Sequence, residues 1–212
     1  ESFSAFVYCS IRIHPNSTTD SISAGIRNAT HVQYLDLWTD IAASHYPLPF
    51  NKLKTLHITH RYPEDPDFVI SQVADLIMRN GDTLQDVMLC RLYQPSTNAI
   101  WEALSSCKRI NKVRFHHCTV EEQTWNAISK VQRLIFTHSY ITFSLGKSPL
   151  TAESPPKLLN MQYLEIFLTV GTLDRGIIEI IRHASNLSTL KLDPDLNAQR
   201  VPYAHQFAMA LK

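Results

Sequence analysis

The sequence predicts an α/β fold, a curved solenoid of repeats in which parallel strands line the concave face and helices cover the convex face. Two observations predict it. First, a six-position pattern, apolar at its first, fourth and sixth positions, starts at residues 6, 32, 53, 84, 110, 131, 161 and 187. Second, segments between several copies place apolar residues three and four apart, which is the spacing of an amphipathic helix. The copies start 21 to 31 residues apart, so each repeat has room for one strand and one connection.

Each copy of the pattern predicts a short strand. Its fourth and sixth positions are two residues apart, so both side chains point to one face of the strand, and we expect that face to be the core. The third, fifth and seventh positions then point the other way. The first copy is the weakest. In chain order the copies are FVYCSI, VQYLDL, LKTLHI, LQDVML, INKVRF, VQRLIF, MQYLEI and LSTLKL.

Four of the intervening segments predict helices, at residues 68–79, 98–107, 121–130 and 175–184. Near each predicted start stands a side chain whose oxygen or negative charge can satisfy the first backbone amides of the helix. These residues are Asp67, Thr97, Thr119 or Glu121, and Asp174. Two connections differ: residues 41–50 are short and rich in proline, and residues 144–160 form a long loop that we expect to be mobile.

Composition limits the number of domains and the classes of partner. With 212 residues, 44% of them apolar, the chain suffices for one well-buried core, and we expect a single repeat domain over residues 1–212. The 20 Lys and Arg nearly balance the 19 Asp and Glu, which argues against nonspecific binding to nucleic acid or to a membrane surface. No apolar run approaches the roughly 20 residues of a membrane-spanning helix. The chain begins without Met, inside an apolar segment, which we interpret as a fragment of a longer protein.

Cysteine usage bears on the compartment. Four cysteines without CxxC spacing favour reduced core thiols, and hence the cytoplasm or the nucleus. The alternative is a secreted protein, in which the sequons at Asn16, Asn28 and Asn186 would carry glycans and the cysteines would pair. The cysteines are Cys9, Cys90, Cys107 and Cys118.

One copy, extended to INKVRFHHCTV, resembles the leucine-rich repeat consensus L-x-x-L-x-L-x-x-N/C-x-L at every marked position. The next copy, VQRLIFTHSYI, fits with Ser139 where the first has Cys118, and small polar groups at this ninth position can bond the turn backbone. The chain is similar to the long, helix-containing members of this superfamily, the ribonuclease-inhibitor-like and F-box leucine-rich repeat proteins. The matching residues of the first copy are Ile110, Val113, Phe115, Cys118 and Val120.

The resemblance implies a protein-binding scaffold. Where an F-box precedes such repeats, it implies the substrate receptor of a ubiquitin ligase, which binds an adaptor through the F-box. No F-box is visible in these 212 residues, so that role depends on a segment outside them. A further alternative is a structural segment whose ends are covered by neighbouring repeats of a larger assembly.

The third, fifth and seventh positions define a candidate binding face for a protein or peptide. Large aromatic side chains beside Arg supply interface hot spots, whereas a merely solvated face carries mainly short polar groups. The alternative is that the aromatics are covered by the long loops or pack across strands for stability. The candidate residues are Tyr34, Asp36, Trp38, His57, Met88, Lys112, Arg114, His116, Arg133, Tyr163, Glu165, Phe167 and Lys191.

Four of these residues predict a small basic patch suited to an acidic peptide or a phosphate group. The alternative is ordinary charge balance against acidic residues of the same face, which are Asp36, Asp86 and Glu165. Nucleic-acid recognition would require a more basic face, so we do not expect it. The patch consists of Lys112, Arg114, His116 and Arg133.

No motif of this sequence predicts catalysis. His116, His117 and Cys118 are competent metal ligands, but adjacent strand residues point to opposite faces, so we expect no metal site here. Neither a G-x-S-x-G nucleophile motif nor a glycine-rich phosphate loop occurs. We therefore expect a binding protein without enzymatic activity and without a cofactor.

Overall fold

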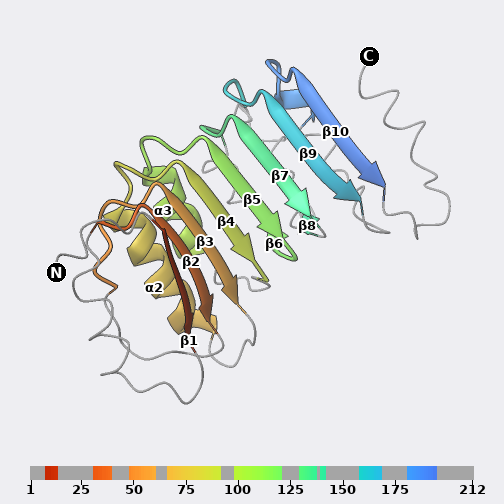
Figure 1. The fold of residues 1–212 in the computed structure, drawn as a ribbon. Coiled ribbons are helices and arrows are strands. Elements are labelled where there is room, and N and C mark those ends of the chain that lie inside the picture. Colours follow the sequence, from red (N-terminus) through yellow and green to blue (C-terminus); the bar gives the residue numbers. More distant parts are fainter. Residues whose placement is uncertain are drawn as a thin grey trace. The chain divides into compact units, whose positions relative to one another are not determined.

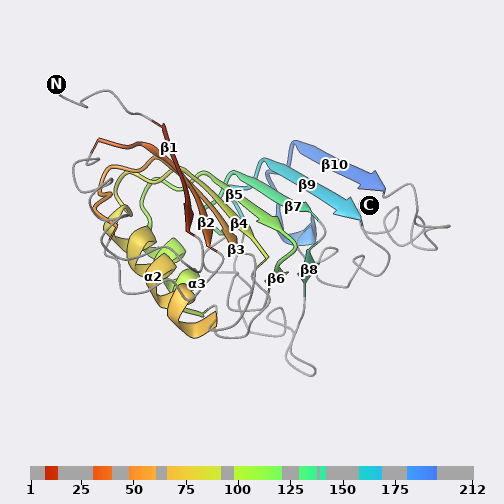
Figure 2. The ribbon, with the colours of Figure 1, turned by 60° about the horizontal axis from the view of Figure 1, so that its bottom comes forward.

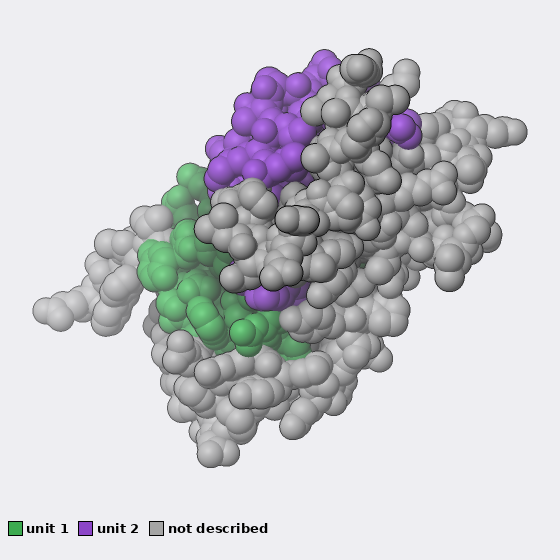
Figure 3. Space-filling model, turned by 90° about the vertical axis from the view of Figure 1, so that its right-hand side faces the viewer, with its two compact units in different colours: residues 1–110 green, residues 111–212 purple. Residues whose placement is uncertain are grey.

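A computed structural model of the chain describes residues 8–13, 31–39, 48–60, 66–91, 98–120, 129–137, 139–141, 158–168 and 181–194. The chain divides into two compact units, unit 1 (residues 1–110) and unit 2 (residues 111–212), which Figure 3 distinguishes by colour. The described residues form an α/β structure with eight long parallel strands, four in each unit. This confirms the predicted α/β class with parallel strands, whereas the curved leucine-rich repeat solenoid and the single domain over residues 1–212 stay predictions.

In unit 1 the strands pair in chain order, each parallel to its neighbours. Two described helices pack against each other and lie on one face of these strands (Figures 1 and 2). Because parallel neighbours must be joined by a crossover, a helix between two strands is the expected connection. The elements are β1 (Tyr8–Ile13), β2 (Tyr34–Thr39), β3 (Thr55–His60), α2 (Pro66–Arg79), β4 (Asp86–Cys90) and α3 (Asn98–Ser106).

In unit 2 four long strands again pair in parallel and in chain order. Two short strands, β6 (Thr119–Val120) and β8 (Tyr140–Ile141), pair in parallel as a separate ladder. Residues 181–183 are helical and precede the last strand. The long strands are β5 (Lys112–His116), β7 (Arg133–Thr137), β9 (Tyr163–Leu168) and β10 (Thr189–Pro194).

The register agrees with the internal alignment of the sequence. Every long strand begins at the third position of its copy, and its residues pair with the same positions of the neighbouring copy. Tyr34 lies opposite Thr55 in unit 1, for example, and Lys112 lies opposite Arg133 in unit 2. Equivalent positions therefore form rows that cross the strands.

The core consists of the positions predicted for it. The fourth and sixth positions of six strands are buried, and the rings of Phe115 and Phe136 stack across β5 and β7 with centroids 5.3 Å apart. On the last strand, the equivalent Leu190 and Leu192 are half-buried. The buried pairs are Leu35 and Leu37, Leu56 and Ile58, Val87 and Leu89, Val113 and Phe115, Leu134 and Phe136, and Leu164 and Ile166.

The helices differ from the prediction at their ends. Helix α2 begins at Pro66, so Asp67 lies inside its first turn and not before it. Proline suits this position because its fixed φ matches the helix and its missing N–H has no helical partner there. Helix α3 begins at Asn98 and ends at Ser106, one residue before the predicted end.

Several predicted features lie outside the described residues. Of the helix expected at 121–130, only residues 129 and 130 are described, and they form a turn. Most of the helix expected at 175–184 and most of the loop at 144–160 are also outside the described residues. The same holds for the start signals Thr97, Glu121 and Asp174 and for the sequons at Asn16 and Asn28. Among the described helices, none combines the length and the apolar character needed to cross a bilayer.

A buried asparagine fastens the end of α2 to the start of β3. Asn80 is 1% exposed, and its Oδ1 accepts a hydrogen bond from the Leu53 amide at 2.8 Å. Its Nδ2 donates to the carbonyl oxygens of Phe50 at 3.0 Å and Leu76 at 2.8 Å. The side chain thus satisfies three backbone groups that would otherwise be buried without partners.

Among the residues that the structure describes, two non-glycine residues adopt left-handed backbone conformations, at equivalent places of their copies. Arg91 has φ of 63° and His117 has φ of 50°. Both occupy the eighth position of their copy, directly after β4 and β5. A side chain at such φ values costs conformational energy, so these turns are determined by the surrounding repeats and not by local preference.

Candidate functional site

The candidate site is the strand face, defined as the third, fifth and seventh positions of the long strands. These side chains lie opposite the buried fourth and sixth positions. The part of the strand face in unit 1 carries Tyr34, Asp36, Trp38, His57 and Met88 of the predicted residues. The part in unit 2 carries Lys112, Arg114, His116, Arg133, Tyr163, Glu165, Phe167 and Lys191.

In unit 1 an aromatic cluster forms around Tyr34. Its ring stacks on Tyr8 of β1, with centroids 4.7 Å apart and planes inclined by 26°. The Tyr34 hydroxyl and Nδ1 of His57 on β3 form a hydrogen bond of 2.6 Å, and the His57 ring lies edge-on to the Tyr34 ring. These contacts hold a partly exposed tyrosine in one orientation between two neighbouring strands.

Tyr8 was missing from the predicted site. It is 55% exposed, the largest exposed fraction among the large apolar and aromatic side chains described. It occupies the third position of the weak first copy and lies directly opposite Tyr34 in the register. The alignment already contained this copy, and taking its third position as part of the candidate face would have identified Tyr8.

Trp38 is held by its own strand. Its indole Nε1 donates a hydrogen bond to Oδ2 of Asp36 at 3.0 Å, which satisfies the polar edge of a ring that remains partly exposed. Met88 on β4 is also partly exposed. An aromatic ring with a satisfied N–H and a partly exposed surface is well suited to contact a protein partner.

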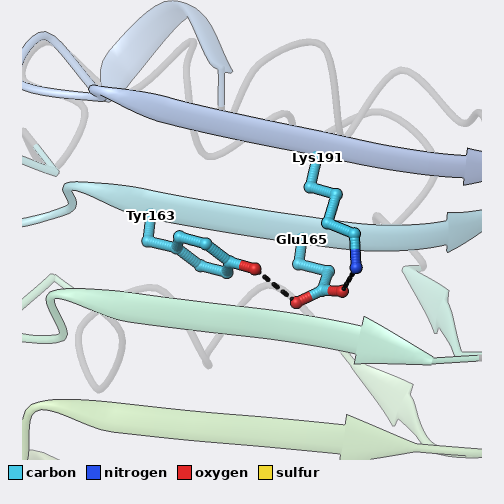
Figure 4. A network of polar contacts seen from close by, with 3 residues as sticks. All are labelled: Tyr163, Glu165 and Lys191. Atoms are coloured by element: carbon cyan, nitrogen blue, oxygen red, sulfur yellow. Dashed lines mark hydrogen bonds and ion pairs between the residues drawn. The ribbon is translucent and has the colours of Figure 1, made fainter.

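In unit 2 a chain of contacts crosses β7, β9 and β10, and Figure 4 shows its part on β9 and β10. The guanidinium of Arg133 lies over the ring of Tyr163, 4.6 Å from its centroid. The Tyr163 hydroxyl donates to Oε2 of Glu165 at 2.6 Å, and Nζ of Lys191 pairs with Oε1 at 2.5 Å (Figure 4). The Lys191 ammonium also lies 5.5 Å from the centroid of the Phe167 ring.

Opposing effects determine the charge state of Glu165. Burial by itself raises the pKa of Glu165, but hydrogen bonds from Lys191 and Tyr163, with the charges of Lys191 and Arg133, hold the pKa below its usual range. The same hydrogen bond raises the pKa of Tyr163. At neutral pH the pair is therefore a carboxylate and a neutral phenol, with Lys191 as the counter-ion of the carboxylate.

The predicted basic patch lies together on β5 and β7. Lys112 lies directly opposite Arg133, and Arg114 lies opposite Ile135. His116, two residues further along β5, lies opposite Thr137. Of the acidic residues considered as balancing charges, Glu165 pairs with Lys191 and also interacts with the charge of Arg133, and Asp36 accepts a hydrogen bond from Trp38. The third, Asp86, is the first residue of β4, so charge balance stays an alternative interpretation of the patch.

Two predicted site residues are not accessible as expected. Both lie on the strand face, but His57 is buried beside Tyr34, and Glu165 is only 8% exposed. His57 contacts Tyr34 of the neighbouring strand, whereas Glu165 contacts Tyr163 of its own strand and Lys191 of the neighbouring strand. Direct partner contact stays a prediction for these two residues, whose side chains form hydrogen bonds with Tyr34, and with Tyr163 and Lys191, respectively.

Strand alternation was expected to separate the side chains of His116, His117 and Cys118, and the observed geometry differs from this. Strand β5 ends at His116, so strict alternation does not apply, and the rings of His116 and His117 meet edge-on with centroids 4.5 Å apart. Within the described part of the chain, no group of three potential ligands is placed to hold a metal ion. Ser139 acts as predicted, since its Oγ accepts from the Cys118 amide at 3.2 Å and donates to the Thr137 carbonyl at 3.1 Å.

The cysteines, all of which are described, are present as thiols. Burial raises the pKa of both Cys9 and Cys90, and at Cys90 the nearby Arg91 and Thr59 act weakly in the opposite direction. A raised pKa keeps a thiol protonated at neutral pH, which is the opposite of what a nucleophilic cysteine needs.

Comparisons of this chain with models of protein families, with curated proteins and with solved structures found no match. The similarity to leucine-rich repeat proteins therefore depends on the repeat pattern of the sequence alone.

Proposed function

We propose that the chain is a non-catalytic interaction scaffold, a solenoid of the leucine-rich repeat type, which binds a protein or peptide through its strand face. The repeat pattern, the parallel strands in register and the buried fourth and sixth positions support the solenoid. The leucine-rich consensus at residues 110–120 supports the repeat type.

The observation that carries the proposal is the arrangement of aromatic side chains on the strand face. Each of four aromatic residues is partly exposed and held by contacts to a neighbouring strand or to its own strand. Fixed aromatic side chains lose little entropy on binding and make large contacts, which is why they dominate interfaces. These residues are Tyr34, Trp38, Tyr163 and Phe167.

The experiment that tests the proposal is affinity capture from the native source, followed by mass spectrometry. The wild-type chain is compared with Tyr34→Ala/Trp38→Ala in unit 1 and with Tyr163→Ala/Phe167→Ala in unit 2. The double substitution in the unit that contacts a given partner should weaken capture of that partner at least about tenfold, because loss of hot-spot residues has effects of this size.

Two exposed apolar residues away from the strand face provide the matched control. Met78 on α2 is 52% exposed, and Leu159, in the turn before β9, is 49% exposed. The Met78→Ala/Leu159→Ala variant should capture the same partners as the wild type. Partners that are lost with the control and kept by both strand-face variants would refute the proposal.

The role of a ubiquitin-ligase substrate receptor is a narrower form of the same proposal. It rests on the family resemblance, and no contact among the described residues favours it over other scaffolds. Co-capture of ligase subunits together with partners sensitive to the strand-face substitutions would support it.

A further inference from the structure

We propose that the strand face of unit 1 binds a lysine or arginine side chain of a partner peptide, with Asp36 as its carboxylate and Tyr8 as its aromatic contact. This inference rests on the proposed function and specifies the chemistry of the ligand. Two strands of the same pattern support it, β2 in unit 1 and β9 in unit 2.

Strands β2 and β9 carry the same types of outward residue. Their copies read VQYLDLW at residues 32–38 and MQYLEIF at residues 161–167. Each strand therefore presents a tyrosine at the third position, a carboxylate at the fifth and a second aromatic ring at the seventh. These residues are Tyr34, Asp36 and Trp38 on β2, and Tyr163, Glu165 and Phe167 on β9.

In unit 2 a lysine of the chain itself occupies this arrangement. Lys191 lies directly opposite Glu165 in the register, and its Nζ pairs with the Glu165 carboxylate (Figure 4). The same ammonium group lies 5.5 Å from the centroid of the Phe167 ring. A carboxylate attracts a cation through its charge, and an aromatic ring attracts it through its quadrupole. Unit 2 thus shows which kind of group this arrangement of side chains accepts.

In unit 1 the chain supplies no lysine or arginine at the equivalent positions. The residues directly opposite Asp36 are Ser10 on β1 and His57 on β3. Arg12, the one arginine or lysine on this part of the strand face, lies opposite Trp38 in the register. Within the described part of the chain, the half-buried Asp36 carboxylate has one polar contact, the hydrogen bond from Trp38 Nε1. Because the indole is neutral, this bond leaves the negative charge of Asp36 in place for a cationic ligand.

Tyr8 provides the aromatic contact beside this carboxylate. It lies opposite Tyr34, so its Cα atom is about 8 Å from that of Asp36, and a side chain placed between them can reach both. One face of the Tyr8 ring stacks on Tyr34, yet the residue is 55% exposed, so the other face is accessible. Tyr34 is in turn held by its hydrogen bond with His57. The exposed face of Tyr8 is therefore oriented in advance for a cation–π contact.

The charge of this part of the face favours a basic partner. The third, fifth and seventh positions of unit 1 include two acidic residues and one basic residue, a formal net charge of −1 with histidine neutral. A negative surface repels an acidic peptide or a nucleic-acid backbone and attracts a basic segment. The acidic residues are Asp36 and Asp86, and the basic residue is Arg12.

The test is selection from a random peptide library on the immobilised full chain. Peptides of about ten residues span ~33 Å in extended form, which exceeds the width of the four strands of unit 1. Enriched peptides are synthesised with a fluorescent label, and their dissociation constants are measured by anisotropy. We expect peptides that contain Lys or Arg, which bind at least about tenfold more weakly to Asp36→Asn. Tyr8→Leu keeps an apolar side chain but removes the ring, and it should weaken binding about threefold.

The matched control is Asp75→Asn, which makes the same change at an exposed position of α2. It should weaken binding by less than about twofold, because a charge away from the site acts only through the screened long-range field. Equal losses in Asp36→Asn and Asp75→Asn would overturn the inference. Enrichment of peptides without basic residues, or no enrichment, would overturn it as well.

A lysine introduced into the chain provides a second test. Ser10 is exposed and lies directly opposite Asp36, so Ser10→Lys should pair with Asp36 as Lys191 pairs with Glu165. We expect it to weaken binding of the basic peptides at least about tenfold. Asn51→Lys adds the same charge at an exposed position outside the strand face and should weaken binding by less than about twofold. Equal effects of the two lysines would overturn the inference.

Thermal unfolding establishes that each variant folds. If Asp36→Asn does not fold, Tyr8→Leu and Ser10→Lys decide the inference, since both change exposed positions. The proposed function is judged separately. If captured partners depend on Tyr34 and Trp38 but not on Asp36, the scaffold stands and the basic ligand does not. If selected peptides depend on Asp36 while no captured partner depends on a strand-face substitution, the basic-ligand site stands and the scaffold does not.

Discussion

Lys191 lies directly opposite Glu165 in the register of β10 and β9, and the two side chains form an ion pair of 2.5 Å. The partners are in different environments, because the lysine side chain is 53% exposed and that of the glutamate only 11%. An exposed lysine weakens the pair by solvent screening, whereas the second hydrogen bond from Tyr163 keeps the buried carboxylate satisfied. Glu165 therefore stabilises unit 2 through two contacts, one with Lys191 and one with Tyr163.

Replacing Glu165 should make the stability of unit 2 less dependent on pH. The folded-state pKa of Glu165 is lowered, so the carboxylate stabilises the fold above its unfolded pKa of about 4.3. This contribution is lost as the pH falls through the folded-state pKa. Urea unfolding at several pH values should show Glu165→Gln about 1 kcal/mol less stable at neutral pH, with a difference that shrinks in acid. A difference that does not change with pH would contradict the prediction.

Removing the Asn80 amide should destabilise unit 1 severely. Asn80→Ala leaves the Leu53 amide and the Phe50 and Leu76 carbonyls without their side-chain partner. Since each buried, unsatisfied group costs about 1 kcal/mol or more, we expect a loss of about 3 kcal/mol in the free energy of unfolding. Urea denaturation followed by circular dichroism measures it. The exposed Asn51 is the control, and a similar loss in Asn51→Ala would show that the buried network is not the cause.

Replacing Arg91 by glycine should leave the stability of the fold intact, whereas replacing it by valine should lower it. Arg91 is exposed and has φ of 63°, a conformation that glycine adopts without steric cost and a β-branched residue resists. We expect Arg91→Gly to match or exceed the wild type in stability and Arg91→Val to lose about 1 kcal/mol. Thermal unfolding tests both. At the exposed Glu102 in α3, by contrast, Glu102→Gly should lower the free energy of unfolding by up to about 1 kcal/mol.

Two adjacent residues of β7 should respond very differently to truncation. Phe136 occupies the buried sixth position and stacks on Phe115, so Phe136→Ala should cost about 3–5 kcal/mol. Ile135 occupies the partly exposed fifth position, and Ile135→Ala should cost less than about 1 kcal/mol. Chemical denaturation of the two variants compares them directly. Similar losses would show that the register of β7 is shifted.

The strands and their core could be predicted because one physical rule determines both. Alternation along a strand assigns Leu134 and Phe136 to one face and Ile135 to the other, and the repetition of this pattern identifies the register. The start of α2 was less predictable. Asp67 is a good candidate for a helix start, but Pro66 is equally good at the first helical position, and the proline begins the helix.

The accessibility of the candidate site was only partly predictable. Alternation places His57 and Glu165 on the strand face, but it does not report what neighbouring strands bring over them. His57 contacts Tyr34 of the neighbouring strand, and Glu165 contacts Tyr163 of its own strand and Lys191 of the neighbouring strand, none of which alternation alone reports. The left-handed turns at Arg91 and His117 were not predictable either, since neither residue type demands a positive φ.

The residue-for-residue pairing of the strands has a consequence for how such a chain changes during evolution. Because every long strand starts at the same position of its copy, the lengths of the connections do not enter the register. An insertion between strands leaves every row of side chains in alignment. Loss or duplication of a whole copy removes or adds one strand together with its outward side chains. Under the proposed function, binding specificity could be altered one strand at a time while the rest of the strand face is inherited unchanged.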